Sequence, residues 1–173
     1  MTHAATRLAA LCALALAGCA APPAVEAPAL SGRLALQVAA HAAEPARHLG
    51  ATFELRGSAE QGELALSTPI GSTIAQARWW PGDAELTTSD GSRRFTDLDA
   101  LTQQMLGEPL PLPALFDWLR ARPWPGADSA RTDAGFDQLG WRVDLSRHAE
   151  GWVTMQRAQP PAVTLRVRLD DAR

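Results

Sequence analysis

The sequence of 173 residues contains no lysine and no tyrosine, and its two cysteines, Cys12 and Cys19, both lie near the N-terminus. Because no cysteine follows residue 19, the rest of the chain cannot form an internal disulfide or a cysteine-based zinc site. The missing lysines exclude a phosphate-binding loop of the Gly-Lys-Ser/Thr type. A formal net charge of −3 gives no general attraction to nucleic acid. What is present is 46% apolar residues, a share typical of a globular domain.

Motifs for catalysis or metal binding are also missing. The histidines beyond residue 18 are His41, His48 and His148, and none has a carboxylate or a second histidine at ligand-like spacing. No serine stands in a Gly-x-Ser-x-Gly sequence, so a nucleophile elbow has no candidate. The sequence therefore offers no catalytic residue, no cofactor-binding residue and no metal ligand, and it predicts a protein that is not an enzyme and does not bind nucleic acid.

The N-terminal segment predicts an export signal. Residues 1–18 contain one charge, Arg7, followed by an apolar run that is too short for a spanning helix, which needs about 20 residues. The junction Leu16-Ala17-Gly18-Cys19 resembles the bacterial lipobox, in which the cysteine is lipidated and becomes the new N-terminus. Ala20, rather than an aspartate, resembles an outer-membrane address. The alternative is a plain signal peptide in which Cys19 is incidental.

Removal of residues 1–18 takes away one arginine and no acid, which leaves 15 Arg against 19 Asp+Glu and a net charge of −4. Residues 19–30 then begin with Cys19 and continue as a Pro/Ala-rich stretch without periodicity, which we interpret as a tether. Residues 31–173 are expected to form a single domain.

Several short stretches of that domain alternate between apolar and polar residues. The alternating apolar positions are Leu34, Leu36 and Val38; Leu49, Ala51, Phe53 and Leu55; Leu64 and Leu66; Trp141, Val143 and Leu145; and Val163, Leu165, Val167 and Leu169, with a further strand expected from Gly151 to Arg157. A period of two indicates strands with one face exposed. Turn sequences such as Pro81-Gly82-Asp83 separate the stretches, which favours an antiparallel meander.

The middle of the chain has a helical period instead. Its helically spaced apolar residues are Leu98, Leu101 and Met105, then Leu112, Leu115, Phe116 and Leu119. Asp97 suits the start of the first helix, and Gly107 suits its end. The expected fold class is therefore mainly β with inserted helices (α+β): a curved antiparallel sheet with a helical insert, about residues 96–121, laid across one face.

Two features leave alternatives open. The six tryptophans either fill the core or line a ligand cavity. In the loop from Ser67 to Thr73, Ile70 stands between Pro69 and Gly71. An exposed isoleucine forgoes about 1.5–3 kcal/mol of burial, so a place at the loop tip would call for a partner or a membrane. The other reading is that Ile70 folds back onto the sheet.

Three motifs together resemble the LolB family of outer-membrane lipoprotein receptors. They are the strand and loop Gly62–Ser72, the helical stretch Leu106–Leu112 with Leu115 and Trp118-Leu119, and the strand entry Phe136–Trp141. Their order and spacing match the family from about Ser31 to Leu169. The lipobox at Cys19 is similar as well.

The resemblance implies an incomplete antiparallel β-barrel covered by helices, with a hydrophobic cavity between them. It implies a monomer, lipid-anchored in the cell outer membrane and facing the periplasm. Such a protein accepts lipoproteins from a LolA-like periplasmic carrier and inserts their acyl chains into outer-membrane lipid. The membrane-insertion loop would be Pro69, Ile70 and Gly71, with Ile70 in place of the family's usual leucine. The alternative function is a non-catalytic scaffold lipoprotein of envelope assembly that binds protein and no lipid.

Overall fold

The computed structural model describes residues 29–170, so the predicted signal peptide, the predicted lipidation site Cys19 and nearly all of the predicted tether lie outside the described residues. Eleven strands of the described chain form one antiparallel sheet. They are β1 Leu30–Val38, β2 Arg47–Gly57, β3 Gly62–Ser67, β4 Thr73–Trp80, β5 Asp83–Thr88, β6 Gly91–Phe95, β7 Ser129–Thr132, β8 Gly135–Gln138, β9 Trp141–Asp144, β10 Trp152–Arg157 and β11 Val163–Leu169. A single 3-10 turn, His148–Glu150, precedes β10.

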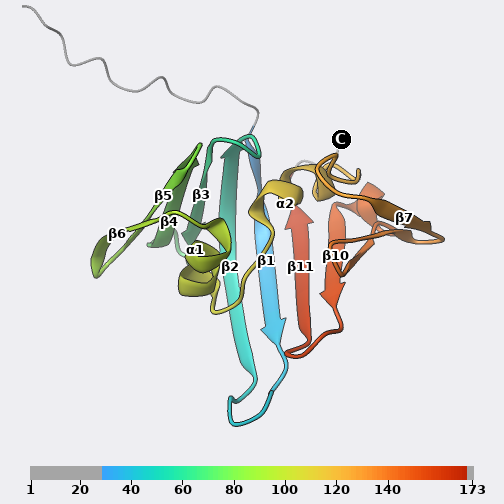
Figure 1. The fold of residues 1–173 in the computed structure, drawn as a ribbon, viewed down its shortest axis with the longest axis horizontal. Helices are drawn as coiled ribbons and strands as arrows, with labels where there is room; N and C mark the ends of the chain where they lie inside the picture. The colour runs from blue at the N-terminus through green and yellow to red at the C-terminus, as the bar shows by residue number, and fades with distance from the viewer. Residues whose placement is uncertain (1–28, 171–173) are drawn as a thin grey trace, which may run out of the picture.

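The strand order is β6-β5-β4-β3-β2-β1-β11-β10-β9-β8-β7, so the first and last strands pair in the middle of the sheet. The two edge strands, β6 and β7, do not pair, and the curved sheet stays open between them (Figure 1). The prediction of an antiparallel sheet built from neighbouring strands is confirmed.

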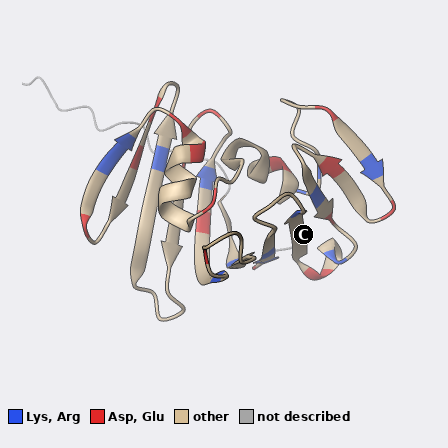
Figure 2. Cartoon of the chain, turned by 60° about the horizontal axis from the view of Figure 1, so that its bottom comes forward, with Lys and Arg blue, Asp and Glu red and all other residues tan. Residues whose placement is uncertain are grey.

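The chain crosses from β6 to β7 through two helices, α1 Leu98–Leu106 and α2 Leu112–Trp118. Both lie in front of the sheet, across its hollow side (Figure 1). Each helix carries one charged residue, an aspartate, and most charges of the described chain lie on strands and turns (Figure 2). We call residues 98–118 the helical insert; both helices lie within the predicted range of residues 96–121.

Alternation along the strands produces the core. In β11, for example, Val163, Leu165 and Val167 are buried, while Arg166 and Arg168 are exposed on the other face. The buried side chains of the strands face the helices, and the exposed ones form the outer face of the sheet.

Local signals at both ends of α1 fix its length. The Asp97 carboxylate accepts a hydrogen bond from the N–H of Asp99 at 3.0 Å, which caps the first turn. Gly107 ends the helix with a φ of 79°, and its N–H donates to the carbonyl of Gln103. This left-handed conformation favours glycine, as the sequence predicted. The Thr102 hydroxyl then accepts a hydrogen bond from the N–H of Leu110 at 2.9 Å and holds the link to α2.

Candidate functional site

An entirely apolar pocket lies between the sheet and the helical insert. It is lined by leucines from strands and helices, together with one phenylalanine and one valine: Leu34, Leu36, Phe53, Leu55, Leu64, Leu106, Leu110, Leu112, Leu115, Leu119, Leu165 and Val167. Its volume is about 30 Å³, which leaves room only for molecules about the size of water. The apolar lining that the family resemblance implies is present, but a cavity with room for an acyl chain is not.

The tryptophans do not line this pocket. Trp79, Trp118 and Trp141 are buried and pack edge-on or tilted against aromatic neighbours, with the Trp118 ring 6.3 Å from that of Trp141 and 6.5 Å from that of Phe136. For these three the core interpretation is right. Trp124 and Trp152 are half-buried and Trp80 is exposed. The cavity-lining interpretation is wrong for the pocket as it stands.

A buried carboxylate fastens the insert to the sheet on one side. Glu108, between α1 and α2, is 5% exposed and accepts from Arg47 Nη2 at 2.9 Å and from Arg157 Nη2 at 3.0 Å. Arg47 begins β2 and Arg157 ends β10, so this Glu108 cluster joins the insert to strands on either side of the central pair. Arg157 also lies over the Trp141 ring at 5.5 Å. Removal of the carboxylate would leave two arginines facing each other.

A buried amide fastens the other side. Gln138, at the end of β8, is 3% exposed, and its Oε1 accepts from Trp118 Nε1 at 2.7 Å and from the N–H of Trp124 at 2.9 Å. Its Nε2 donates to the carbonyls of Trp124 and Ala127, both at 2.7 Å. Every hydrogen-bonding capacity of this amide is used. The network fixes the end of α2 and the segment after it against the sheet.

These polar anchors are the residues that sequence reasoning missed. Glu108 and Gln138 both occur in motifs quoted for the family resemblance, but no role followed from their spacing. The only signal was local: Glu108 is a single acid within the apolar run from Leu106 to Leu112.

The β3–β4 loop, residues 68–72, presents its apolar tip rigidly. The N–H of Gly71 donates to the carbonyl of Thr68 at 2.9 Å, which closes a β-turn with Pro69 and Ile70 at its centre. The N–H of Thr68 donates to the Ser72 carbonyl at 2.8 Å, and the N–H of Ser72 donates to the Thr68 hydroxyl at 3.1 Å. Gly71 has a φ of 89°, which glycine adopts without strain.

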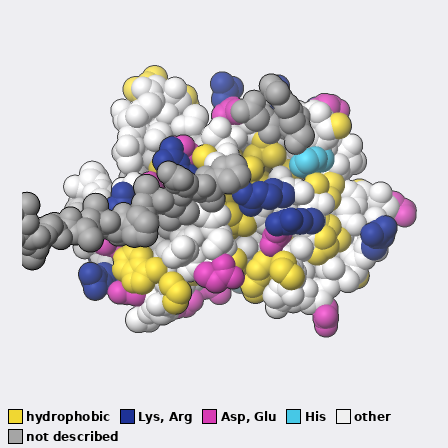
Figure 3. Space-filling view, turned by 90° about the horizontal axis from the view of Figure 1, so that it is seen from above, with side chains coloured by type: hydrophobic (Ala, Val, Ile, Leu, Met, Phe, Trp, Pro, Cys, Tyr) yellow, Lys and Arg dark blue, Asp and Glu magenta, His cyan; other side chains and the backbone are white. Residues whose placement is uncertain are grey.

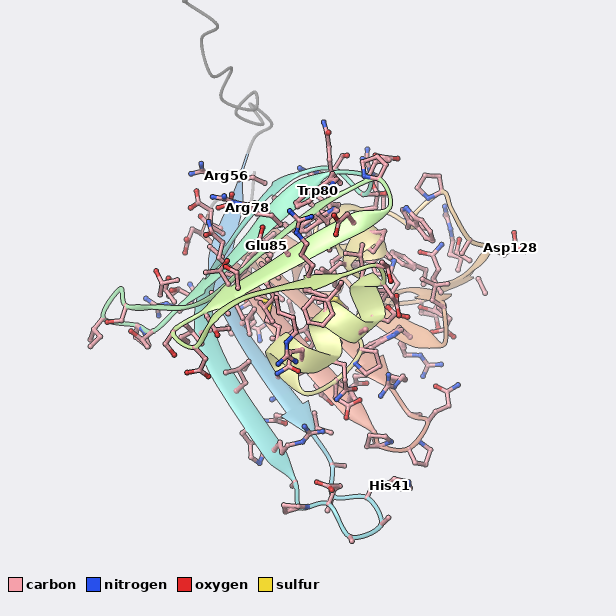
Figure 4. All side chains as sticks on the ribbon, turned by 60° about the vertical axis from the view of Figure 1, so that its left-hand side comes forward. His41, Arg56, Arg78, Trp80, Glu85 and Asp128 are labelled. Carbon is pink, nitrogen blue, oxygen red and sulfur yellow. The ribbon has the colours of Figure 1, made fainter. Side chains whose placement is uncertain are left out.

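Ile70 is 90% exposed at the tip of this turn. The loop projects beyond the strands, on the side away from the helices (Figure 4). The interpretation in which Ile70 folds back onto the sheet is therefore wrong. The predicted trio Pro69, Ile70 and Gly71 is brought together as one exposed turn, and none of the three lines the apolar pocket.

The described residues offer neither a metal site nor a membrane-spanning helix. Among residues 29–170, no group of three His, Cys, Asp or Glu side chains is placed to hold a metal ion. In the same range, neither helix has the length and apolar character needed to span a bilayer.

Comparison with known proteins gives consistent matches. The family model described as "Outer membrane lipoprotein LolB" matches residues 27–171. A protein of Bordetella petrii named outer-membrane lipoprotein LolB is 37% identical over 169 residues, which cover 87% of this chain and 83% of the relative. The protein of the same name from Chromobacterium violaceum is 35% identical over 151 residues, covering 80% of each chain. The similarity thus extends over the whole sheet and its insert.

Proposed function

Because the chain belongs to the LolB family of outer-membrane lipoproteins, we propose that it takes lipoproteins from a LolA-like periplasmic carrier and inserts their acyl chains into the outer membrane. The family places the chain at the outer membrane as a receptor in lipoprotein localisation. It is a family of transport components, and we propose that this chain too acts without catalysis.

The observation that carries the proposal is the wholly apolar lining of the pocket between sheet and insert. Each buried methylene group of an acyl chain is worth about 0.8 kcal/mol, so acyl chains need such a lining while they are out of the membrane. Since the pocket measures about 30 Å³ in the closed molecule, cargo has to displace the insert from the sheet. The Glu108 cluster and the Gln138 network hold the insert to the sheet, so cargo entry would break one or both of these contacts.

Delivery is assigned to the β3–β4 loop. Three hydrogen bonds fix the turn in which Ile70 is 90% exposed. The side chain can therefore be buried only when the loop contacts another apolar phase. Transfer without a nucleotide then runs downhill, with the receptor binding the acyl chains more tightly than the carrier and the membrane more tightly still. Lipidation of Cys19 after cleavage of residues 1–18 would keep this monomeric domain at the membrane, facing the periplasm.

A transfer assay tests the proposal. Carrier loaded with a lipoprotein is mixed with the mature protein, crosslinked at early times, and then offered liposomes. We expect a crosslinked complex with the carrier, followed by lipoprotein in the liposome fraction. Lipoprotein that stays with the carrier would contradict the proposal, as would unaltered lipoprotein sorting in cells depleted of this protein.

The scaffold alternative is separated by ligand binding alone. A fluorescent fatty acyl probe titrated with the mature protein should bind saturably if the pocket receives acyl chains. A scaffold that binds only protein would give no saturable signal, whatever its effect on envelope assembly.

A further inference from the structure

The outer face of the sheet carries its charges in two arrangements. Over β2 to β5 the arginines lie beside acids. Arg56 forms an ion pair with Glu54, and Arg78 Nε lies 3.0 Å from Glu63 Oε2. Figure 4 shows Arg56, Arg78 and Glu85 together on this part of the surface. The charges on this half of the outer face are balanced locally.

Over β1 and β11 the arginines of the described chain have no ion-pair partner. Arg33 stands directly opposite Arg168 in the β1–β11 pairing. Arg166 precedes Arg168 by two residues in β11 and lies on the same face of the sheet. All three are exposed, and within residues 29–170 none of them forms an ion pair. Like charges directly opposite each other destabilise a pair of strands. We call these three residues the outer arginine cluster, and a bound anion would relieve their repulsion.

The neighbouring acids are engaged elsewhere. Glu150 is bound by Arg147, with Nη2 2.6 Å from Oε2, and this hydrogen bond, with a smaller contribution from the charge of Arg168, holds the pKa of Glu150 below its usual value. Asp144 accepts hydrogen bonds from the hydroxyl and the N–H of Ser146, which lower the pKa of its carboxyl group. Asp170, two residues after Arg168, accepts a hydrogen bond from the Ser31 hydroxyl at 2.9 Å. Within residues 29–170, none of these three acids forms an ion pair with the outer arginine cluster.

An amphipathic side chain completes the surface. Trp152 on β10 is half-buried and stands directly opposite Arg168 in the β10–β11 pairing. The guanidinium carbons of Arg147 and Arg168 each lie 5.6 Å from the centre of its ring. Seen from above, the surface of the molecule mixes apolar side chains with positively and negatively charged ones (Figure 3). Tryptophan beside arginine is a combination favoured at the boundary between lipid and water.

The register of the strands connects this surface to the β3–β4 loop. One cross-strand row runs through Ser67, Thr52, Arg33, Arg168 and Trp152, each directly opposite the next. Strands lie about 4.8 Å apart, so the backbone of Arg33 is about 10 Å from that of Ser67. Ser67 is the last residue of β3 before the loop that holds Ile70. The arginines and the apolar tip therefore belong to one continuous outer surface.

We propose that the outer arginine cluster binds the phosphate headgroups of anionic phospholipids and lays the outer face of the sheet on the membrane, with Trp152 at the interface and Ile70 entering the lipid. A lipid surface is the occupant because the arginines and the half-buried tryptophan share one cross-strand row, which leads to Ser67 and so to the loop that exposes Ile70. This assignment rests on the proposed function, since it gives the receptor a fixed orientation for delivery.

The test uses the mature chain with Cys19→Ala, so that no acyl anchor contributes to binding. Cosedimentation is measured with vesicles of phosphatidylcholine alone and of phosphatidylcholine with phosphatidylglycerol. The variant carries Arg33→Gln, Arg166→Gln and Arg168→Gln. Each arginine near an anionic surface is worth about fivefold in binding, so we expect a loss of up to about a hundredfold on the anionic vesicles. High salt should weaken the binding of the parent chain to the anionic vesicles by a similar factor, because salt screens the charges of the arginines.

The matched control carries Arg56→Gln, Arg78→Gln and Arg94→Gln, the same change in net charge on the ion-paired half of the face. It should bind anionic vesicles within about threefold of the parent chain. Equal losses in both triple variants would overturn the proposal, because net charge alone would then explain binding. Equal binding to both vesicle types by the parent chain would overturn it as well.

Two further readouts keep this proposal separate from the proposed function. Saturable binding of a fatty acyl probe in solution should be unchanged in the variant of the outer arginine cluster. If that variant lost binding of the acyl probe but still bound vesicles, the assignment of the cluster to lipid headgroups would be overturned. Weaker capture of the loaded carrier, with intact vesicle binding, would assign the cluster to an acidic protein surface instead. Quenching by brominated lipid, compared between the parent chain and Trp152→Phe, should locate Trp152 at the interface.

Discussion

Two apolar regions of this molecule share a chemistry and differ in what the fold does with it. The pocket between sheet and insert is lined by side chains withdrawn from water, among them Leu112 at 0% and Leu36 at 2% exposure, whereas Ile70 is 90% exposed. Burial of the pocket residues stabilises the closed molecule. Ile70 adds little to folding and keeps its apolar surface available to another phase. Cargo therefore competes with the folding energy of the receptor, and membrane contact does not.

The largest expected effect is the loss of stability when a fully buried side chain of the pocket is shortened. Leu112→Ala removes a completely buried side chain from the insert and should lower the free energy of unfolding by about 2–5 kcal/mol. Urea unfolding measures it. The matched change Ile70→Ala, at the exposed tip, should stay within about 0.5 kcal/mol of the parent protein. If both variants lost the same stability, the distinction between the two regions would be wrong.

The reverse experiment places a charge at the tip. Ile70→Glu should leave acyl-probe binding and unfolding unchanged but reduce delivery to liposomes by about 10- to 150-fold, the equivalent of 1.5–3 kcal/mol of lost apolar burial. The transfer assay measures it. Leu139→Glu is the control, because Leu139 is also exposed, at 46%, but lies in the β8–β9 turn. Normal delivery by Ile70→Glu would remove the loop from the mechanism.

A smaller change tests what keeps the pocket shut. Glu108→Gln keeps the shape of the buried side chain but removes the charge between Arg47 and Arg157, and it should cost about 1–3 kcal/mol of stability. Hydrogen exchange should become faster in α1 and α2 than in β10 and β11. Glu54→Gln is the control: its ion pair with Arg56 is exposed and is worth at most about 1 kcal/mol. Unchanged exchange in the insert would show that the Glu108 cluster does not close the pocket.

The strands that sequence predicted bury large apolar side chains on one face, whereas β4 and β5 were not located because alanines (Ala75, Ala77 and Ala84) fill most of their buried positions and give a weak apolar signal. Alternation located β1, β2, β3, β9, β10 and β11, and helical spacing located both helices. The edge strands β6 and β7 did not show, and the reason is physical. An edge strand has a partner on one side only, and here nearly every residue of Gly91–Phe95 and Ser129–Thr132 is exposed. Without a buried face there is no apolar period to read.

The site divides in the same way between local and distant features. The exposed turn at Ile70 could be predicted, because Pro69 and Gly71 act on their immediate neighbours. The Glu108 cluster could not, because Arg47 and Arg157 are 61 and 49 residues away in the chain. The pocket is closed by side chains from four strands and two helices that pack together. The pattern of any one segment cannot predict such packing.

The smallest effect is expected from a change that keeps the tip apolar and alters only its shape. Ile70→Leu removes the branch at Cβ, which restricts the side-chain torsion. Isoleucine and leucine offer nearly the same apolar surface, so delivery to liposomes should stay within about twofold of the parent protein. Unfolding should not change, because the side chain at 90% exposure packs against almost nothing. Such a result would mean that the membrane responds to the area at the tip, whereas the pocket, whose leucines interlock, responds to shape. A tenfold change in delivery would instead mean that the loop meets a shaped surface, such as a protein, and the contrast between the two regions would lose its physical basis.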